Sequence, residues 1–268
     1  MLSVRYPRRM AEASSRVTLR TLRHRVRDGR PLAMLTCYDA TTARWLARGG
    51  VDLLLVGDTA GSVILGHDDT IHAPLDFMLQ LTAAVRRGAP DAFVMGDMPW
   101  MSYQGSDDDA VRNAARFMLE GRADAVKLEV DGRFTGLIEK LDRANIPAVA
   151  HIGWTPQRTA MTGVPVMAGR TAEKTAALVD TAKAVADAGA VMLLLECATD
   201  DATAAVVDAV DVPVIGCGAG PACHGKVVVL HDWLGLTDWQ PPFAPPLLRG
   251  GESLKKAAEA WLAEVDGG

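Results

Sequence analysis

The sequence lacks the segments that would place a chain in a membrane or on an export route. Residues 1–10 contain no apolar core of a secretory signal peptide. No apolar run in the sequence approaches the roughly 18 residues that a membrane-spanning helix needs. We therefore expect a cytoplasmic protein with no membrane partner.

Cysteine is scarce, which excludes a fold held by disulfides. The 268 residues contain four cysteines, Cys37, Cys197, Cys217 and Cys223, and no two of them form a Cys-x-x-Cys pair. Three of the four lie at or near the ends of predicted strands. This usage is typical of reduced thiols in a cytoplasmic protein.

The chain also lacks a strong excess of either charge. Its net charge is −5, so composition does not indicate a nucleic-acid partner. The first 30 residues are the exception, because they hold nine arginines against Glu12 and Asp28. A mitochondrial transit peptide has this composition. We favour a flexible basic tail over residues 1–17, followed by an exposed basic helix that Thr18 caps.

What the sequence has in plenty is short apolar runs separated by helical patterns. We predict strands at residues 32–39, 51–58, 92–97, 125–129, 148–151, 191–196, 212–215 and 226–231. Helices are predicted at residues 40–48, 75–87, 107–120, 133–144, 171–188, 202–209 and 254–265, with Ser106 and Ser253 as two of the caps.

This alternation predicts a single α/β domain, a (β/α)8 TIM barrel over residues 18–268. One feature departs from that pattern, because only about ten residues separate the last two strands, too few for a normal crossover helix. A doubly wound sheet is the alternative. It would not bring residues from so many strand ends to one opening.

Several of the apolar runs end in an acid. Asp58, Asp97, Glu129 and Glu196 stand at four such ends, and in a barrel these ends surround the active site. Lys127 and His151 belong to the same set, and Lys127 shares a strand face with Glu129 because the two are two residues apart. Each acid alone could be a helix cap. Together they suit a hard cation such as Mg²⁺, since no Cys or His is spaced for zinc.

The same residues lie in stretches that resemble ketopantoate hydroxymethyltransferases. The matching stretches are residues 36–39, 55–58, 96–99, 126–129, 151–157, 195–197, 215–220 and 229–232. The resemblance extends from about residue 18 to residue 243. It implies a (β/α)8 barrel that assembles as a homo-oligomer. The implied reaction transfers a one-carbon unit from the co-substrate 5,10-methylene-tetrahydrofolate to C3 of a 2-oxo acid.

The resemblance also implies roles for individual residues. Asp58, Asp97 and Glu129 would hold Mg²⁺, and the 2-oxo acid would bind around it. Thr59 and Lys127 would contact the substrate, as would His151 in the pocket. Glu196 would be the base that removes the C3 proton. Such a base needs correct placement beside an acidic C–H.

Departures from the family pattern cluster at the predicted mouth of the barrel. They fall at Thr59, where the family has serine, at Trp154, and in residues 68–70, 130–131, 163–170 and 224–226. Ordinary divergence would produce them. A Mg²⁺-dependent aldolase or lyase of another 2-oxo acid, working without folate, would produce them too. A non-catalytic barrel is a third hypothesis, which the retained Asp58, Asp97 and Glu196 disfavour.

Overall fold

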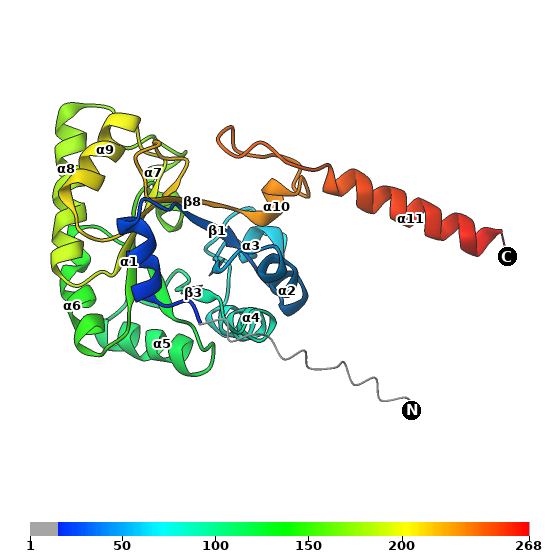
Figure 1. Ribbon diagram of the computed structural model, residues 1–268, viewed down its shortest axis with the longest axis horizontal. Coiled ribbons are helices and arrows are strands. Elements are labelled where there is room, and N and C mark those ends of the chain that lie inside the picture. Colours follow the sequence, from blue (N-terminus) through cyan, green and yellow to red (C-terminus); the bar gives the residue numbers. More distant parts are fainter. Residues whose placement is uncertain (1–15, 268) are drawn as a thin grey trace.

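A computed structural model describes residues 16–267, over which eight parallel strands close into a barrel surrounded by helices (Figure 1). The predicted single α/β barrel is therefore confirmed. Most of the predicted flexible tail, residues 1–15, lies outside the described residues. Its last two positions contact the barrel, since Arg16 forms an ion pair with Asp124 and the Val17 N–H donates to the Asp91 carbonyl.

Each strand pairs with its neighbours in sequence, and β8 pairs with β1 to close the barrel. The strands are β1 (Leu32–Thr36), β2 (Leu53–Val56), β3 (Phe93–Asp97), β4 (Ala125–Glu129), β5 (Ala148–Gly153), β6 (Met192–Glu196), β7 (Val214–Cys217) and β8 (Gly225–Val228). The prediction that the eighth strand runs to His231 is wrong. It ends at Val228 because the following residues turn into a short helix that contains His231.

The helices follow the strands, except after β7. They are α1 (Leu19–Arg27), α2 (Ala40–Arg48), α3 (Ala60–Val63), α4 (Leu75–Gly88), α5 (Asp107–Leu119), α6 (Thr135–Arg143), α7 (Thr159–Thr162), α8 (Ala172–Asp187), α9 (Asp200–Ala209), α10 (Leu230–Trp233) and α11 (Gly250–Asp266), with 3-10 turns η1 (Gly132–Phe134) and η2 (Pro156–Arg158). None of residues 218–224, all of them described, is helical.

Two of the predicted caps are confirmed and one is wrong. The hydroxyls of Thr18 and Ser106 accept hydrogen bonds from backbone N–H groups in the first turns of α1 and α5. Ser253 does not cap the last helix. That helix begins at Gly250, and the Ser253 hydroxyl donates back to the Arg249 carbonyl.

The period of two along each strand separates the barrel interior from the layer under the helices. Phe93 and Met95 of β3, Ala125 of β4, and Met192 and Leu194 of β6 pack together in the interior cluster. Residues between them point outward into the larger cluster beneath the helices. Strands buried on both faces explain the near-continuous apolar runs of the sequence.

Gly88 lies at a contact that admits no side chain. It ends α4, and a Cβ atom there would lie 2.2 Å from the backbone oxygen of Ala40, the first residue of α2. We expect Gly88→Ala to lower the free energy of unfolding by about 1–3 kcal/mol, because the backbones of α4 and α2 would have to move apart to make room for the methyl group. Urea unfolding measures this. Gly136→Ala, at an exposed position of α6 where nothing lies within 4 Å, is the control and should be neutral or stabilising.

One outer face of the barrel is less covered than the rest. On β1 and β8 the outward residues Ala33 and Lys226 are exposed, whereas β2, β3 and β4 are buried throughout. The last helix, α11, leaves the barrel and extends away from it (Figure 1). No side chain between residues 250 and 266 is buried against the described chain. The barrel therefore leaves one outer face incompletely covered, and its last helix exposes apolar side chains.

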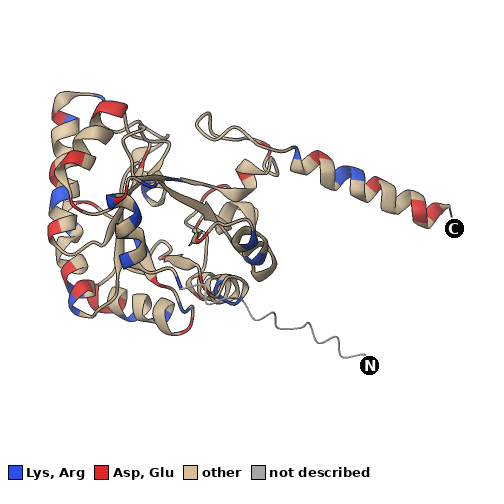
Figure 2. Cartoon of the chain, in the orientation of Figure 1, with Lys and Arg blue, Asp and Glu red and all other residues tan. Residues whose placement is uncertain are grey.

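Acidic and basic side chains are intermixed on the outer helices and on α11 (Figure 2). No helix within residues 16–267 is both long enough and apolar enough to span a bilayer. The cytoplasmic location stays a prediction.

Candidate active site

The candidate site is the top layer of the barrel interior. The next inward-facing positions after the apolar layers are Asp97 on β3, Lys127 and Glu129 on β4, His151 on β5 and Glu196 on β6. Asp58 follows β2 after Gly57. The structure therefore brings together all of the acids and both of the basic residues that were predicted from the strand ends.

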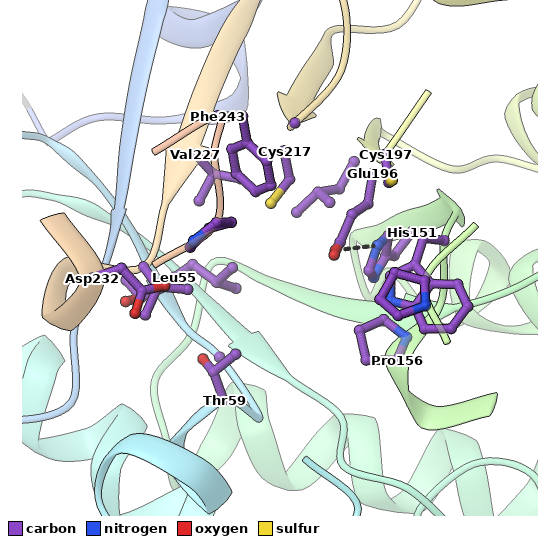
Figure 3. A pocket seen from close by; sticks show the side chains of 18 of the residues that line it. Leu55, Thr59, His151, Pro156, Glu196, Cys197, Cys217, Val227, Asp232 and Phe243 are labelled. Atoms are coloured by element: carbon purple, nitrogen blue, oxygen red, sulfur yellow. Dashed lines mark ion pairs between the residues drawn. The ribbon is translucent and has the colours of Figure 1, made fainter. Parts of the chain in front are cut away.

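These side chains line one cavity of about 520 Å³ at the carboxyl ends of the strands (Figure 3). Thr59 lines it as well, and its hydroxyl lies 2.7 Å from the Tyr38 hydroxyl. Gly57 permits this position, since a Cβ atom there would lie 2.8 Å from Thr59 Oγ1. The substitution of threonine for the family's serine keeps a hydroxyl at the cavity wall.

Asp58, Asp97, Lys127 and Glu129 form the floor of the cavity. Within it, Asp97 and Lys127 form a buried ion pair. Asp97 Oδ1 lies 2.9 Å from Lys127 Nζ, and both side chains are less than 5% exposed. The two atoms are close, but their alignment falls outside the geometry of a hydrogen bond. Asp97 Oδ2 accepts a hydrogen bond from the Asp58 N–H at 2.9 Å, which ties the ends of β2 and β3 together.

Gln157 organises two of the three acids, although its role was not predicted. Its Nε2 donates to Asp58 Oδ2 at 2.9 Å, and its backbone N–H donates to Glu129 Oε2 at 3.0 Å. Tyr103 in turn donates to Gln157 Oε1 at 2.7 Å and accepts from the Glu129 N–H at 3.0 Å. Gln157 fell within the stretch 151–157 that matches the family. Nothing in the sequence placed Tyr103 beside it.

The floor holds more acidic than basic side chains. Burial and then the like charge of Asp58 raise the pKa of Asp97 to about 8. Burial also raises the pKa of Glu129 well above its usual range. Burial acts to lower the pKa of Lys127, but Asp97, Asp58 and Glu129 outweigh it and the net shift is upward. Three carboxylates beside one ammonium leave a formal excess of two negative charges when all are ionised.

This charge and chemistry suit a divalent cation. Asp97 Oδ1 and Glu129 Oε1 are buried oxygens without a hydrogen-bond partner in the described chain. In Asp58, Oδ2 accepts the hydrogen bond from Gln157, and Oδ1 accepts none from the described residues. Mg²⁺ commonly takes one or two carboxylates and completes its octahedron with substrate and water oxygens. The described residues do not gather three His, Cys, Asp or Glu side chains into one ligand set. The ligand set Asp58, Asp97 and Glu129 therefore stays a prediction.

His151 and Glu196 face each other across the neighbouring strands (Figure 3). His151 Nε2 lies 3.1 Å from Glu196 Oε2, close but poorly aligned for a hydrogen bond. On its other side Nδ1 lies 3.3 Å from Lys127 Nζ. Because the lysine can only donate, Nδ1 accepts and Nε2 carries the ring proton. Burial, reinforced by the charge of Lys127, lowers the pKa of His151 and keeps the ring neutral.

Glu196 differs from the other acids in its surroundings. Its side chain is 20% exposed, compared with 2% or less for Asp97 and Glu129, and it opens into the cavity. The neighbouring thiols of Cys197 and Cys217 also line the cavity. Burial, followed by the charge of Glu196, raises the pKa of both thiols, so they stay protonated. Glu196 is therefore the acid that can reach a bound molecule without first leaving a buried network.

The departures from the family pattern do not all lie at the mouth. Trp154, Pro165 and Met167 line the cavity. Residues 224–226 do not, because Gly225 begins β8 and His224 accepts a hydrogen bond from the Val214 N–H at the start of β7. The prediction that this segment belongs to the mouth is wrong.

A closed parallel barrel whose charged side chains meet at the carboxyl ends of its strands defines an enzyme of the (β/α)8-barrel class. Solved structures with this fold include a 2,3-dimethylmalate lyase of the PEP mutase/isocitrate lyase superfamily, with a TM-score of 0.62 and 18% identity over 94% of this chain and 89% of that one. A phosphoenolpyruvate phosphomutase from Streptomyces platensis subsp. rosaceus gives a TM-score of 0.65 and 15% identity over 92% and 88%. At these identities the likeness shows the fold alone.

The sequence pattern of ketopantoate hydroxymethyltransferase matches residues 16–268. A 3-methyl-2-oxobutanoate hydroxymethyltransferase of Syntrophobacter fumaroxidans is 43% identical over 240 residues, 89% of this chain and 85% of the relative. One of Pyrobaculum aerophilum is 42% identical over 89% of this chain and 90% of its own length. The chain belongs to the ketopantoate hydroxymethyltransferase family and is a transferase of one-carbon groups. The hypothesis of a non-catalytic barrel is therefore wrong.

Proposed function

We propose that the chain transfers a hydroxymethyl group from 5,10-methylene-tetrahydrofolate to C3 of 3-methyl-2-oxobutanoate, giving ketopantoate in pantothenate biosynthesis. The observation that carries the proposal is the division of the acids in one cavity. Asp58, Asp97 and Glu129 are buried with Lys127, while Glu196 alone is open beside a neutral His151. One group of acids suits a cation and an anionic substrate, and the other acid suits proton removal.

Asp58 and Asp97 would hold Mg²⁺, with Glu129 next to them. The cation, when bound, supplies Lewis-acid polarisation of the 2-oxo group and stabilises negative charge on its oxygen. Lys127 adds a fixed positive charge on the floor, and the Thr59 hydroxyl offers a donor to the substrate carboxylate.

Glu196 would take the C3 proton, and the resulting carbanion would form a bond to the one-carbon unit of the donor. Both bonds from that carbon to the folate nitrogens break, and each nitrogen gains a proton. Water supplies the hydroxyl oxygen of the product, so its two protons and the one from C3 balance the reaction. The neutral His151 would stay beside Glu196, with its Nε2 3.1 Å from the carboxylate.

A second candidate is a Mg²⁺-dependent aldolase or lyase of a different 2-oxo acid, with no folate. The observation that favours it is the apolar wall that Trp154, Pro165 and Met167 give to the cavity at positions where the family pattern is not kept. The two candidates share proton removal from C3 and differ in the carbon donor.

The deciding experiment measures deuterium exchange at C3 and product formation over a panel of 2-oxo acids, with and without Mg²⁺ and 5,10-methylene-tetrahydrofolate. We expect 3-methyl-2-oxobutanoate to show Mg²⁺-dependent exchange without the folate donor. Product should form only when the folate donor is present. Turnover with free aldehydes and none with the folate would support the aldolase. Exchange that is unchanged after Mg²⁺ is removed with a chelator would contradict the role of Asp58 and Asp97.

We further propose that the chain works as a homo-oligomer. Leu254, Trp261, Leu262 and Val265 repeat at helical spacing on one side of α11, and each is at least 58% exposed. A helix with such a stripe is stable when the stripe is covered. The incompletely covered outer face of β8 and β1 on a second copy would cover it.

This assembly can be tested by light scattering. We expect the unmodified chain to be larger than a monomer and Trp261→Glu to lower its mass, because a carboxylate would be buried in the contact. Lys256→Glu, on the opposite side of α11, is the control and should leave the mass unchanged. A monomeric unmodified chain would contradict the proposal.

A further inference from the structure

The cavity has a second side that the chemistry described so far does not use. Its polar floor comes from β2 to β6, whereas the opposite side comes from β8, α10 and the segment that follows α10. Asp232, Trp239, Pro241, Pro242 and Phe243 line this second side. A volume of about 520 Å³ falls in the range that drug-sized ligands fill, so a small 2-oxo acid on the floor leaves much of it open.

The second side presents aromatic surface. Phe243 rests against the end of β7, where Gly218 has a φ of +60° and a Cβ atom would lie 2.6 Å from the phenyl ring. The ring points into the cavity between Val227 and Cys217 (Figure 3). Although they line a cavity, Phe243 is 49% exposed and Trp239 is 72% exposed. Exposed aromatic side chains at a cavity wall favour a flat ligand that covers them.

Asp232 adds one acid to this aromatic side. Its Oδ1 accepts a hydrogen bond from the Thr237 hydroxyl at 2.7 Å, which holds the carboxylate in place. No residue among 16–267 donates a hydrogen bond to its Oδ2. Asp232 and Glu196 stand on opposite sides of the cavity (Figure 3). A ligand that reaches both must extend across the floor.

A ligand of this cavity should be flat, should offer donors to Asp232 and should reach across the floor to Glu196. A reduced pterin meets these three requirements. It is a flat two-ring system, and one edge carries an amino group beside a ring N–H. Two adjacent donors of this kind match a carboxylate as a guanidinium does. The nitrogens that hold the one-carbon unit lie on the other side of the ring system. With its donor edge at Asp232, the pterin would turn the one-carbon unit toward Glu196 and the C3 atom on the floor.

We propose that Asp232, Trp239 and Phe243 form the subsite for the pterin ring of the one-carbon donor. The inference rests on the proposed function, because it names where the second substrate of that reaction sits. It assigns Asp232 to recognition of the pterin edge, and Phe243 and Trp239 to its flat faces. The floor residues remain with the 2-oxo acid.

The test separates the two substrates. Asp232→Asn keeps the size of the side chain but places an amide N–H₂ where the pterin offers donors. We expect it to raise the KM for 5,10-methylene-tetrahydrofolate about tenfold or more, the effect of losing a charged hydrogen-bond partner. Phe243→Ala and Trp239→Ala should raise the same KM, and calorimetry with tetrahydrofolate should show weaker binding by all three variants. The KM for the 2-oxo acid and C3 exchange without donor should change much less.

The matched control is Asp238→Asn, the same change on an exposed acid of the same segment that does not line the cavity. Melting temperatures check that each variant is folded. Unchanged donor KM and tetrahydrofolate affinity in Asp232→Asn would overturn the subsite, as would an equal rise in the KM for the 2-oxo acid. A wild-type chain that shows exchange but no folate-dependent product would instead overturn the proposed function. The two failures are therefore distinguishable.

Discussion

Glu196→Gln should slow deuterium exchange at C3 of the 2-oxo acid by at least about a hundredfold, the usual contribution of a positioned general base. Glutamine has the same length and shape but cannot accept the proton at neutral pH. The floor would be intact, because Asp58, Asp97, Glu129 and Lys127 do not contact Glu196 through hydrogen bonds in the described chain. Substrate binding should therefore change little while proton removal is lost.

The measurement is the decay of the C3 proton signal in heavy water with Mg²⁺ and no folate donor. Glu139→Gln, on the exposed side of α6, is the control for the loss of one carboxylate and should exchange at the wild-type rate. Exchange by Glu196→Gln within a few fold of wild type would mean that another group is the base. His151 would then be the next residue to test, since its Nε2 lies 3.1 Å from Glu196.

Much of this site could be predicted because a strand has a strict period of two. Once Phe93 and Met95 are taken as interior, Asp97 must be interior as well, and the same reasoning places Lys127 and Glu129 on one face. The barrel follows from eight apolar runs with helices between them. The resemblance added a separate role for Glu196, that of the base. The cavity geometry is compatible with this role, because Glu196 is more exposed than the other acids.

What could not be predicted depends on contacts between distant parts of the chain. Tyr103 and Gln157 are 54 residues apart, and no local sequence pattern predicts that they share a hydrogen bond beside Glu129. The eighth strand was predicted to run to His231, whereas it ends at Val228. The position of Asp232 depends on that same correction, since it follows from α10 forming directly after β8.

Arg86 is a further residue whose importance appears only in the folded chain, and its replacement should have the largest effect on stability. It is 4% exposed near the end of α4. Its guanidinium donates to the carbonyls of Arg122 at 2.9 Å and Ala92 at 2.6 Å, and it pairs with Asp124. The end of α4 is thereby joined to the starts of β3 and β4. The sequence does not predict this connection, because Arg86 and Arg87 are both basic residues at the end of a predicted helix and no pattern distinguishes them.

We expect Arg86→Met to lower the free energy of unfolding by about 3–5 kcal/mol, the cost of removing one partner from a buried charged pair. Methionine fills similar space but removes the donor that Arg86 supplies to Asp124 and to the carbonyls of Pro90, Ala92 and Arg122. The Asp124 carboxylate would retain only Arg16 and the Val94 N–H. Urea unfolding of the full chain measures the loss.

Arg116→Met is the matched control, because Arg116 also pairs with two acids, Glu120 and Asp76, but is 37% exposed. Exposed pairs contribute about 0–1 kcal/mol, so this variant should unfold close to wild type. Equal losses for the two variants would mean that the buried network at Arg86 adds nothing beyond charge. The predicted difference arises because water can replace the partner of a surface acid but is excluded from the buried hydrogen bond that Arg86 makes to the Ala92 carbonyl just before β3.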